Sequence, residues 1–497
     1  MSNSPYQELE SRFERLSKIN EAAGILQWDM ACNMPSGGAE ARAGQLSALK
    51  VLSHEGLADP ALADFLDAAG ADQTLDPWQQ ANLEAMRRRR ARAVAVDADL
   101  VRRLSEAGSA CEMLWREAKA ESDFAMIQPS LAELRDLVAE RASALAAALN
   151  LDPYDALLDG YEPDGRAAKI APVFDDLAAF LPGFIDDVLA RQAKAGPLLD
   201  LPGPFALDVQ RRLCRSMMEV VGFDFDHGRL DESHHPFCGG VPEDIRITTR
   251  YSEDNFMPGL MGVLHETGHA LYEQGLPARW RHQPVGKARG MALHESQSLM
   301  IEMQACRSAE FITFAAPRMK EAFGGEGPAW DAANILRHYN KVERGFIRVD
   351  ADEVTYPAHV ILRFRLERAM LAGDLAVADL PGAWNDGMQE LLAITPPDDA
   401  RGCLQDIHWY DGAWGYFPTY TLGAMAAAQL FAAARAAHPD IPDGLARGDF
   451  TRLLGWLREN VHGKASSLTT DKLLAEATGS PLQADAFKAH LQSRYLA

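Results

Sequence analysis

The stretch Gly262 to Gly275, GVLHETGHALYEQG, most constrains how this chain can fold. Its apolar residues recur three and four positions apart, a proline stands in the preceding turn, and a glycine and another proline follow it. This pattern predicts a helix with defined ends. On that helix His265 and His269 stand one turn apart on one face, so their imidazoles can share one metal ion.

Glu266 completes an H-E-x-x-H pattern in this helix. A carboxylate beside the histidine pair can take a proton from a metal-bound water, as in zinc hydrolases. The chain holds fourteen histidines, and such a pattern arises by chance on the order of a few per cent of the time in a chain like this. We therefore predict that Glu266 is the general base of a hydrolytic metal site.

A catalytic metal site needs a third protein ligand. The continuation x-x-G-x-x-H is absent, because Tyr272 and Gly275 hold those places. The candidate is instead Glu295, which lies 295 − 269 = 26 residues beyond the second histidine on the next predicted helix. Two histidines, a glutamate and an open fourth position predict one catalytic zinc ion per chain, and cobalt suits the same ligands.

Together these segments resemble the M32 metallocarboxypeptidases of the carboxypeptidase Taq type. HETGH is followed at the family's distance by HESQS, and four further family motifs come in the family's order. They are HPF at 235–237, DIRIT at 244–248, IRVDAD at 347–352 and GCLQDIHW at 402–409. The chain departs from the family pattern after HESQS, where Leu299, Ile301 and Met303 replace the usual residues. That departure concerns the packing behind Glu295.

The resemblance implies a saddle-shaped helical fold similar to neurolysin and angiotensin-converting enzyme, with two lobes around a deep cleft, and usually a homodimer. The chain's own pattern agrees with an all-α class, because helical periodicity dominates and strand signals are few and short. Residues 245–250 alternate as a strand, for which we expect an edge position that docks an extended peptide. No clear linker is present, so we predict a single catalytic domain over residues 1–497 with a very small sheet near the site.

Further site candidates follow from the resemblance. Related folds place a histidine and a tyrosine over the metal, which makes His408 and Tyr420 candidates for stabilising the oxyanion, against packing roles in a core and a loop. His235 either contacts the substrate carbonyl or closes its own loop. Glu302 lies two turns after Glu295 and either supports a metal ligand or forms an exposed salt bridge.

A carboxypeptidase must hold a terminal carboxylate, and arginine does so with two parallel donors. Arg348 is the first candidate because the resemblance places its motif beside the cleft. The alternative is that Asp350 and Asp352 take it as an ion-pair partner. Arg246 and Arg250, on the predicted strand, are the next candidates.

The composition limits the kinds of partner and the compartment that suit this chain. A net charge of −22 makes nucleic acid or an anionic membrane an unsuitable partner. The basic run Arg87 to Arg90 is interpreted as a solvated helix face. Six scattered cysteines, the absence of a signal peptide and the lack of an apolar run of membrane length predict a cytoplasmic protein.

The predicted function is a zinc-dependent carboxypeptidase with broad specificity for peptides. An endopeptidase or a dipeptidyl-carboxypeptidase on the same scaffold is the near alternative, because sequence does not show whether the cleft is blocked beyond the leaving residue. A metal-dependent binding protein without catalysis is the alternative of another class. The presence of Glu266 argues against it.

Overall fold

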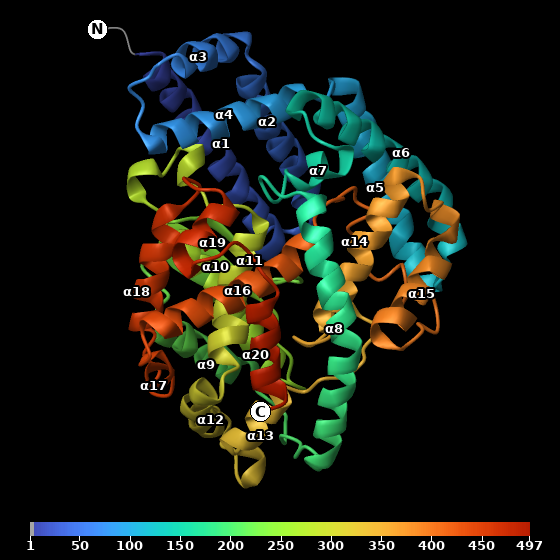
Figure 1. The fold of residues 1–497 in the computed structure, drawn as a ribbon, viewed down its shortest axis with the longest axis vertical. Coiled ribbons are helices and arrows are strands. Elements are labelled where there is room, and N and C mark those ends of the chain that lie inside the picture. The colour runs from blue at the N-terminus through green and yellow to red at the C-terminus, as the bar shows by residue number, and fades with distance from the viewer. Residues whose placement is uncertain (1–3) are drawn as a thin grey trace.

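The computed structural model describes residues 4–497, and helices dominate it (Figure 1). The first nine helices are α1 (Pro5–Cys32), α2 (Ala39–Ala58), α3 (Pro60–Gly70), α4 (Pro77–Val94), α5 (Ala98–Glu121), α6 (Phe124–Leu149), α7 (Pro153–Leu158), α8 (Ala167–Lys194) and α9 (Leu207–Val221). The others are α10 (Met257–Gln274), α11 (Met291–Leu299), α12 (Ala309–Phe323), α13 (Ala332–Tyr339), α14 (Tyr356–Ala372), α15 (Leu380–Leu392), α16 (Pro418–Ala437), α17 (Ile441–Leu445), α18 (Thr451–Asn460), α19 (Thr470–Thr478) and α20 (Asp485–Tyr495). The all-α prediction is confirmed. No helix among the described residues is long and apolar enough to cross a membrane.

Local sequence signals explain where the key helices begin and end. The helix predicted around the H-E-x-x-H pattern is α10, with Pro258 in its first turn and Gly275 as its C-cap. In α4, Asp76 accepts a hydrogen bond from the backbone N–H of Gln79, whose side chain accepts one from the backbone N–H of Asp76. This capping box fixes the start of the helix that carries the arginine run.

A three-stranded sheet precedes α10. Its strands are β1 (Gly228–Glu232), β2 (Phe237–Val241) and β3 (Asp244–Thr249). The order is β1-β3-β2, with β3 parallel to β1 and antiparallel to β2. The strand expected from the alternation at 245–250 is therefore present as β3, but the predicted edge position is wrong, because β3 pairs on both sides. The edge strand next to it in the chain is β2.

Two large hydrophobic clusters form most of the core. One is built mainly from α5, α6, α8, α14 and α15, and the other from α9, α10, α12, α13 and α18. Helices α11 and α16 contribute to both, since Ala292 and Met425 belong to the first while Leu293 and Leu430 belong to the second. In Figure 1 these helices lie near the middle of the view, between the two groups. The two clusters thus meet at the helix that carries Glu295.

The close packing of α11 against α10 and α16 positions Glu295. A Cβ at Gly423 of α16 would lie 2.7 Å from Cβ and Cγ of Glu295. A Cβ at Gly268 of α10 would lie 2.6 Å from Cα of Ser298 in α11. Both positions therefore need glycine for α11 to pack this tightly against its two neighbours.

Candidate active site

Helices α10 and α11 bring together His265, His269 and Glu295. The Nε2 atoms of the two histidines lie 3.8 and 3.4 Å from Oε2 of the glutamate. One potential ligand atom from each of the three residues lies within 4.8 Å of the others. This is the ligand set predicted from the sequence, and two imidazole nitrogens with one carboxylate oxygen suit zinc or a similar divalent metal.

The other ring nitrogen of each histidine is held by a neighbour. Nδ1 of His265 lies 2.9 Å from Oε2 of Glu302, and Nδ1 of His269 lies 3.0 Å from the backbone oxygen of His294. A carbonyl oxygen only accepts, so His269 carries its proton on Nδ1 and keeps the Nε2 lone pair for a cation. These outer hydrogen bonds orient both rings toward Glu295.

Glu302 lies in a π-helical segment, Met300–Cys306, that continues α11. It is buried, and besides contacting His265 it accepts a hydrogen bond of 2.5 Å from Arg307. The alternative of an exposed salt bridge is therefore wrong. Ile301, one of the departures from the family pattern, is buried next to it in the chain and belongs to the core behind the site.

The electrostatics of the site favour a cation. Burial disfavours the charged form of His265, but Glu295 and Glu302 outweigh it and raise its pKa to about 10. Burial also raises the pKa of Glu266 to about 7. Three carboxyl groups thus surround two imidazoles, and a divalent ion would balance this charge better than a single proton does.

Glu266 lies on the same helix as the two histidines and is nearly buried, with 8% of its surface exposed. Within residues 4–497 its carboxylate takes part in no hydrogen bond or ion pair, unlike Glu295 and Glu302. A carboxylate that is enclosed yet unpaired is free to accept a proton from a water at the site.

His408 and Tyr420 lie together. Nε2 of His408 is 3.3 Å from the hydroxyl of Tyr420. Burial lowers the pKa of His408 to about 4, so its ring is neutral at pH 7, and its buried Nδ1 has no hydrogen-bond partner among residues 4–497. Burial, together with Tyr416 and Glu295, raises the pKa of Tyr420, so its hydroxyl keeps its proton. Glu295 is among the charges that raise the pKa of the Tyr420 hydroxyl.

Arg348 is held by an aspartate that we did not predict. Asp406 accepts hydrogen bonds from Nε and Nη2 of Arg348, and Nη1 donates to the hydroxyl of Tyr356 at 2.8 Å. The alternative that Asp350 and Asp352 take Arg348 as an ion-pair partner is wrong, because Asp406 holds it and Asp352 accepts from backbone N–H groups such as that of Val354. The signal was present in the sequence, since Asp406 lies in the QDIHW motif two residues before His408.

Asp406 also binds Arg363, at 2.6 Å, so one carboxylate serves two buried guanidinium groups. Their charges outweigh the effect of burial and hold the pKa of Asp406 well below its ordinary value. Arg348 has five N–H donors, of which Asp406 and Tyr356 occupy three. One N–H on each terminal nitrogen of Arg348 is left for another acceptor.

The remaining candidates, His235, Arg246 and Arg250, have surroundings of their own among the described residues. His235 is exposed, and its backbone oxygen accepts from Ser233 at 2.6 Å, so its backbone closes the loop while its ring stays free. Arg246 pairs with Asp244 and stacks 4.0 Å over the ring of Trp28. Arg250 is exposed. In the described part of the chain, no hydrogen bond or ion pair connects these three to the metal-ligand candidates.

Comparisons with known proteins identify the family of this chain. The family model described as carboxypeptidase Taq (M32) metallopeptidase matches residues 8–495. Thermostable carboxypeptidase 1 of Thermus thermophilus is 38% identical over 99% of this chain and 98% of its own length. Carboxypeptidase 1 of Bacillus subtilis is 33% identical over 97% and 96%. The solved Trypanosoma cruzi metallocarboxypeptidase 1 superposes with a TM-score of 0.97 at 39% identity, covering 99% of both chains.

The fold and these relatives define a peptidase of the metal-dependent hydrolase class. More particularly, the chain belongs to the carboxypeptidase Taq (M32) family and is a metallocarboxypeptidase. The resemblance inferred from the motifs is therefore confirmed over nearly the whole chain.

Proposed function

We propose that this metallocarboxypeptidase removes single C-terminal residues from peptides with broad specificity, and that its metal is zinc held by His265, His269 and Glu295. The observation that carries the proposal is the convergence of both Nε2 atoms on one carboxylate oxygen. Cobalt suits the same donors and is the alternative metal. A divalent metal bound there polarises the peptide carbonyl and lowers the pKa of a water.

The chain's own residues supply the remaining steps. Glu266 takes a proton from the attacking water and delivers it to the leaving amine. His408 donates through Nε2 to the hydroxyl of Tyr420, whose own proton is then directed at the developing oxyanion. Arg348, oriented by Asp406, offers its two remaining N–H groups to the terminal carboxylate. Arg246, Arg250 and His235 are secondary candidates for substrate contacts.

The product pattern tests this function. The zinc-loaded protein is incubated with an unstructured peptide, and the products are read by mass. A ladder that shortens by one residue at a time from the C-terminus is the expected result. Steps of two residues would support a dipeptidyl-carboxypeptidase, internal fragments would support an endopeptidase, and an unchanged peptide would support a binding protein.

The cellular setting and assembly are part of the proposal. All six cysteines are free, which supports the reducing cytoplasm as the compartment. The protein acts on peptides as a homodimer, with neither nucleic acid nor membrane as a partner. Light scattering at micromolar concentration tests the dimer: twice the chain's 54.5 kDa is expected.

A further inference from the structure

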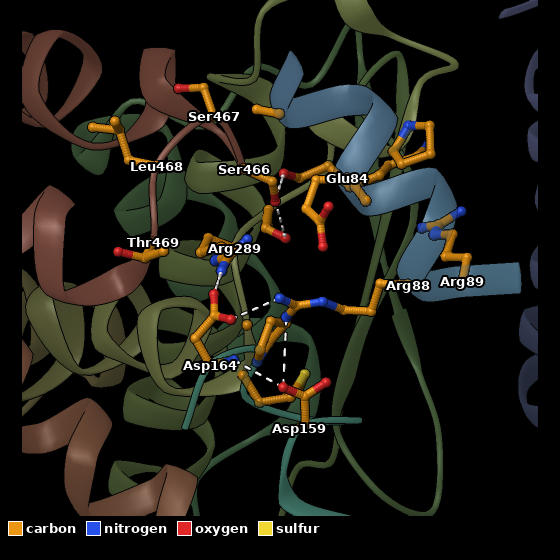
Figure 2. A pocket seen from close by; sticks show the side chains of 18 of the residues that line it. Glu84, Arg88, Arg89, Asp159, Asp164, Arg289, Ser466, Ser467, Leu468 and Thr469 are labelled. Carbon is orange, nitrogen blue, oxygen red and sulfur yellow. Dashed lines mark hydrogen bonds and ion pairs between the residues drawn. The ribbon is translucent and has the colours of Figure 1, made fainter. Parts of the chain in front are cut away.

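A cavity of about 660 Å³ lies beside the metal-ligand cluster (Figure 2). Its walls come from α4, the segment 159–164 after α7, the segment 287–294 that leads into α11, and the segment 466–469 before α19. None of the three metal-ligand candidates lines it. Their neighbours His294 and Glu273 do.

The arginine run contributes to this cavity. One face of α4, with residues at helical spacing from Ala81 to Arg92, forms a wall. Figure 2 shows Arg88 extending from that helix across to the acidic residues of the opposite wall. Its Nη2 lies 2.6 Å from Asp164 and its Nη1 lies 3.6 Å from Asp159. The interpretation of the run as a solvated helix face is therefore wrong for Arg88.

The cavity holds more positive than negative charge. Asp159 and Asp164 are shared among four arginines, Arg88, Arg92, Arg166 and Arg289. Asp164 accepts from Arg88 and pairs with Arg289, and Asp159 pairs with Arg166 at 3.3 Å. Three of these arginines line the cavity with the two carboxylates, and Arg166 lies outside its wall. Lys287 and Glu273, which also line it, cancel each other in formal charge, so the lining stays positive in a protein whose net charge is −22.

Two further cations on the wall have no ion-pair partner in the described part of the chain. Arg89 and Lys472 line the cavity and form no ion pair within residues 4–497. The Arg89 side chain is exposed to the water of the cavity, so its guanidinium can reach a ligand that enters it. Glu84 is the one acidic side chain of the wall that is likewise unpaired within those residues. The unpaired groups also sum to a positive charge.

The cavity lies next to the metal-ligand candidates on one side and next to the candidate oxyanion donors on the other. The ring of His294 stacks 4.5 Å from that of His269, and its Nε2 lies 3.0 Å from Glu273. On the other side, Tyr161 of the cavity wall packs edge-on at 4.9 Å against Tyr416, beside the candidate oxyanion donors. A peptide whose scissile bond lies at the metal can thus reach the cavity with its neighbouring residues.

We propose that this cavity is a subsite for an acidic side chain of the peptide, N-terminal to the scissile bond, bound chiefly by Arg89 and Lys472. This inference rests on the proposed function, because that function places the terminal carboxylate at Arg348, which does not line the cavity. The residues before the scissile bond are then the ones left to enter it. An aspartate or glutamate there meets unpaired cations at a site with an excess of positive charge.

Matched peptides test the inference. Each pair of hexapeptides shares its C-terminal residue and differs only by Glu or Gln at one of the three positions before the scissile bond. The zinc-loaded enzyme should cleave the Glu peptide with a kcat/KM higher by roughly fivefold at one of these positions, the worth of one partly exposed ion pair. The ratio should fall toward one in high salt.

Variants of residues in the cavity wall show whether the cavity causes the preference for the Glu peptide. Arg89→Gln combined with Lys472→Gln should remove the Glu preference, because kcat/KM should fall much more for the Glu peptide than for the Gln peptide. Glu84→Gln should increase the preference, because it removes the opposing charge. Arg102→Gln, which changes an exposed arginine of α5 paired with Asp99 and Glu106, is the control and should keep the wild-type ratio.

Two results would overturn the inference. One is cleavage of all peptides with no Glu preference at any of the three positions, and the other is a preference that survives in the Arg89 and Lys472 double variant. Failure to shorten even the Gln peptides from the C-terminus has a different meaning. It contradicts the proposed carboxypeptidase function and the subsite with it.

Discussion

The metal side and the arginine side of the site are built in different ways. On the metal side, α10 and the next helix supply His265, His269 and Glu295, and helical spacing together with two close helix contacts sets their geometry. On the arginine side, Arg348 is positioned by Asp406, which lies 58 residues further along the chain. The first side depends on local structure and the second on a buried charge network, so the two should fail differently when single residues are changed.

The largest expected effect is on the metal side. Glu266→Gln keeps the shape of the side chain but cannot accept a proton, so kcat should fall by roughly 10³-fold while KM changes little. Steady-state kinetics on the zinc-loaded variant, with its metal content measured in parallel, provide the test. A variant that kept the metal and a tenth of the wild-type rate would refute the assignment of Glu266 as the base.

On the arginine side the effect should depend on the substrate's end group. Arg348→Ala should cost on the order of 2–4 kcal/mol in kcat/KM for a free-acid peptide, because a charge-assisted double contact is lost. The kcat/KM for the C-terminally amidated form of the same peptide, which is already a poor substrate of the wild type, should change little. Equal losses for both forms would mean that the carboxylate binds elsewhere, and Arg246 and Arg250 would be tested next.

A smaller effect is expected on the affinity for zinc when Glu302, which holds the ring of His265, is changed. Glu302→Gln removes the charge that orients His265, and the affinity for zinc should drop by about tenfold to a hundredfold. Competition with a chromophoric chelator measures it. Glu321→Gln, an exposed glutamate of α12, is the matched control, and equal affinities in both variants would contradict a supporting role for Glu302.

The two sides are joined behind the site by Glu353. It pairs with His490 at 2.8 Å and Arg494 at 3.1 Å in α20, and Arg494 also donates to the backbone oxygen of Met303 in the π-helical segment. Burial opposes its ionisation, but the His490 and Arg494 charges outweigh this and hold the pKa of Glu353 well below the ordinary value of 4.5.

A group with a depressed folded pKa stabilises the fold above its unfolded pKa and loses that contribution as the pH falls. Glu353→Gln should therefore lower the free energy of unfolding most at pH 7. The gap to the wild type should shrink as the pH drops below about 4.5. Urea titrations between pH 7 and 3 measure this effect, which is the smallest of those expected. A difference in the free energy of unfolding that grows as the pH falls would contradict the role of Glu353.

What could be predicted from the sequence follows the same division. The His265 and His269 pair needs only helical periodicity, and Glu295 needs only the next helix, so the approach of these three candidate ligands to one another was within reach of local reasoning. Asp406 as the partner of Arg348 was not, because nothing in local spacing selects one aspartate among several. The family resemblance indicates the motifs that contain Arg348 and Asp406, but it does not indicate that these two residues are in contact.

The same limit explains two other corrections. The alternation at 245–250 correctly predicted β3, but its central place depends on pairing with β1 and β2, which lie earlier in the chain. The polar helix around Arg88 predicts a solvated face, whereas its partner Asp164 lies 76 residues away in the chain. Strand order and ion pairing across the fold are tertiary properties, and periodicity carries no information about them.

The most direct test of the central claim is the metal content of the purified chain. Elemental analysis after zinc loading and gel filtration should give one ion per chain for the wild type and for His227→Ala, an exposed histidine paired with Asp224. Glu295→Ala and His269→Ala should retain much less than one ion and lose activity. Full occupancy in either of these two variants would contradict a metal held by His265, His269 and Glu295.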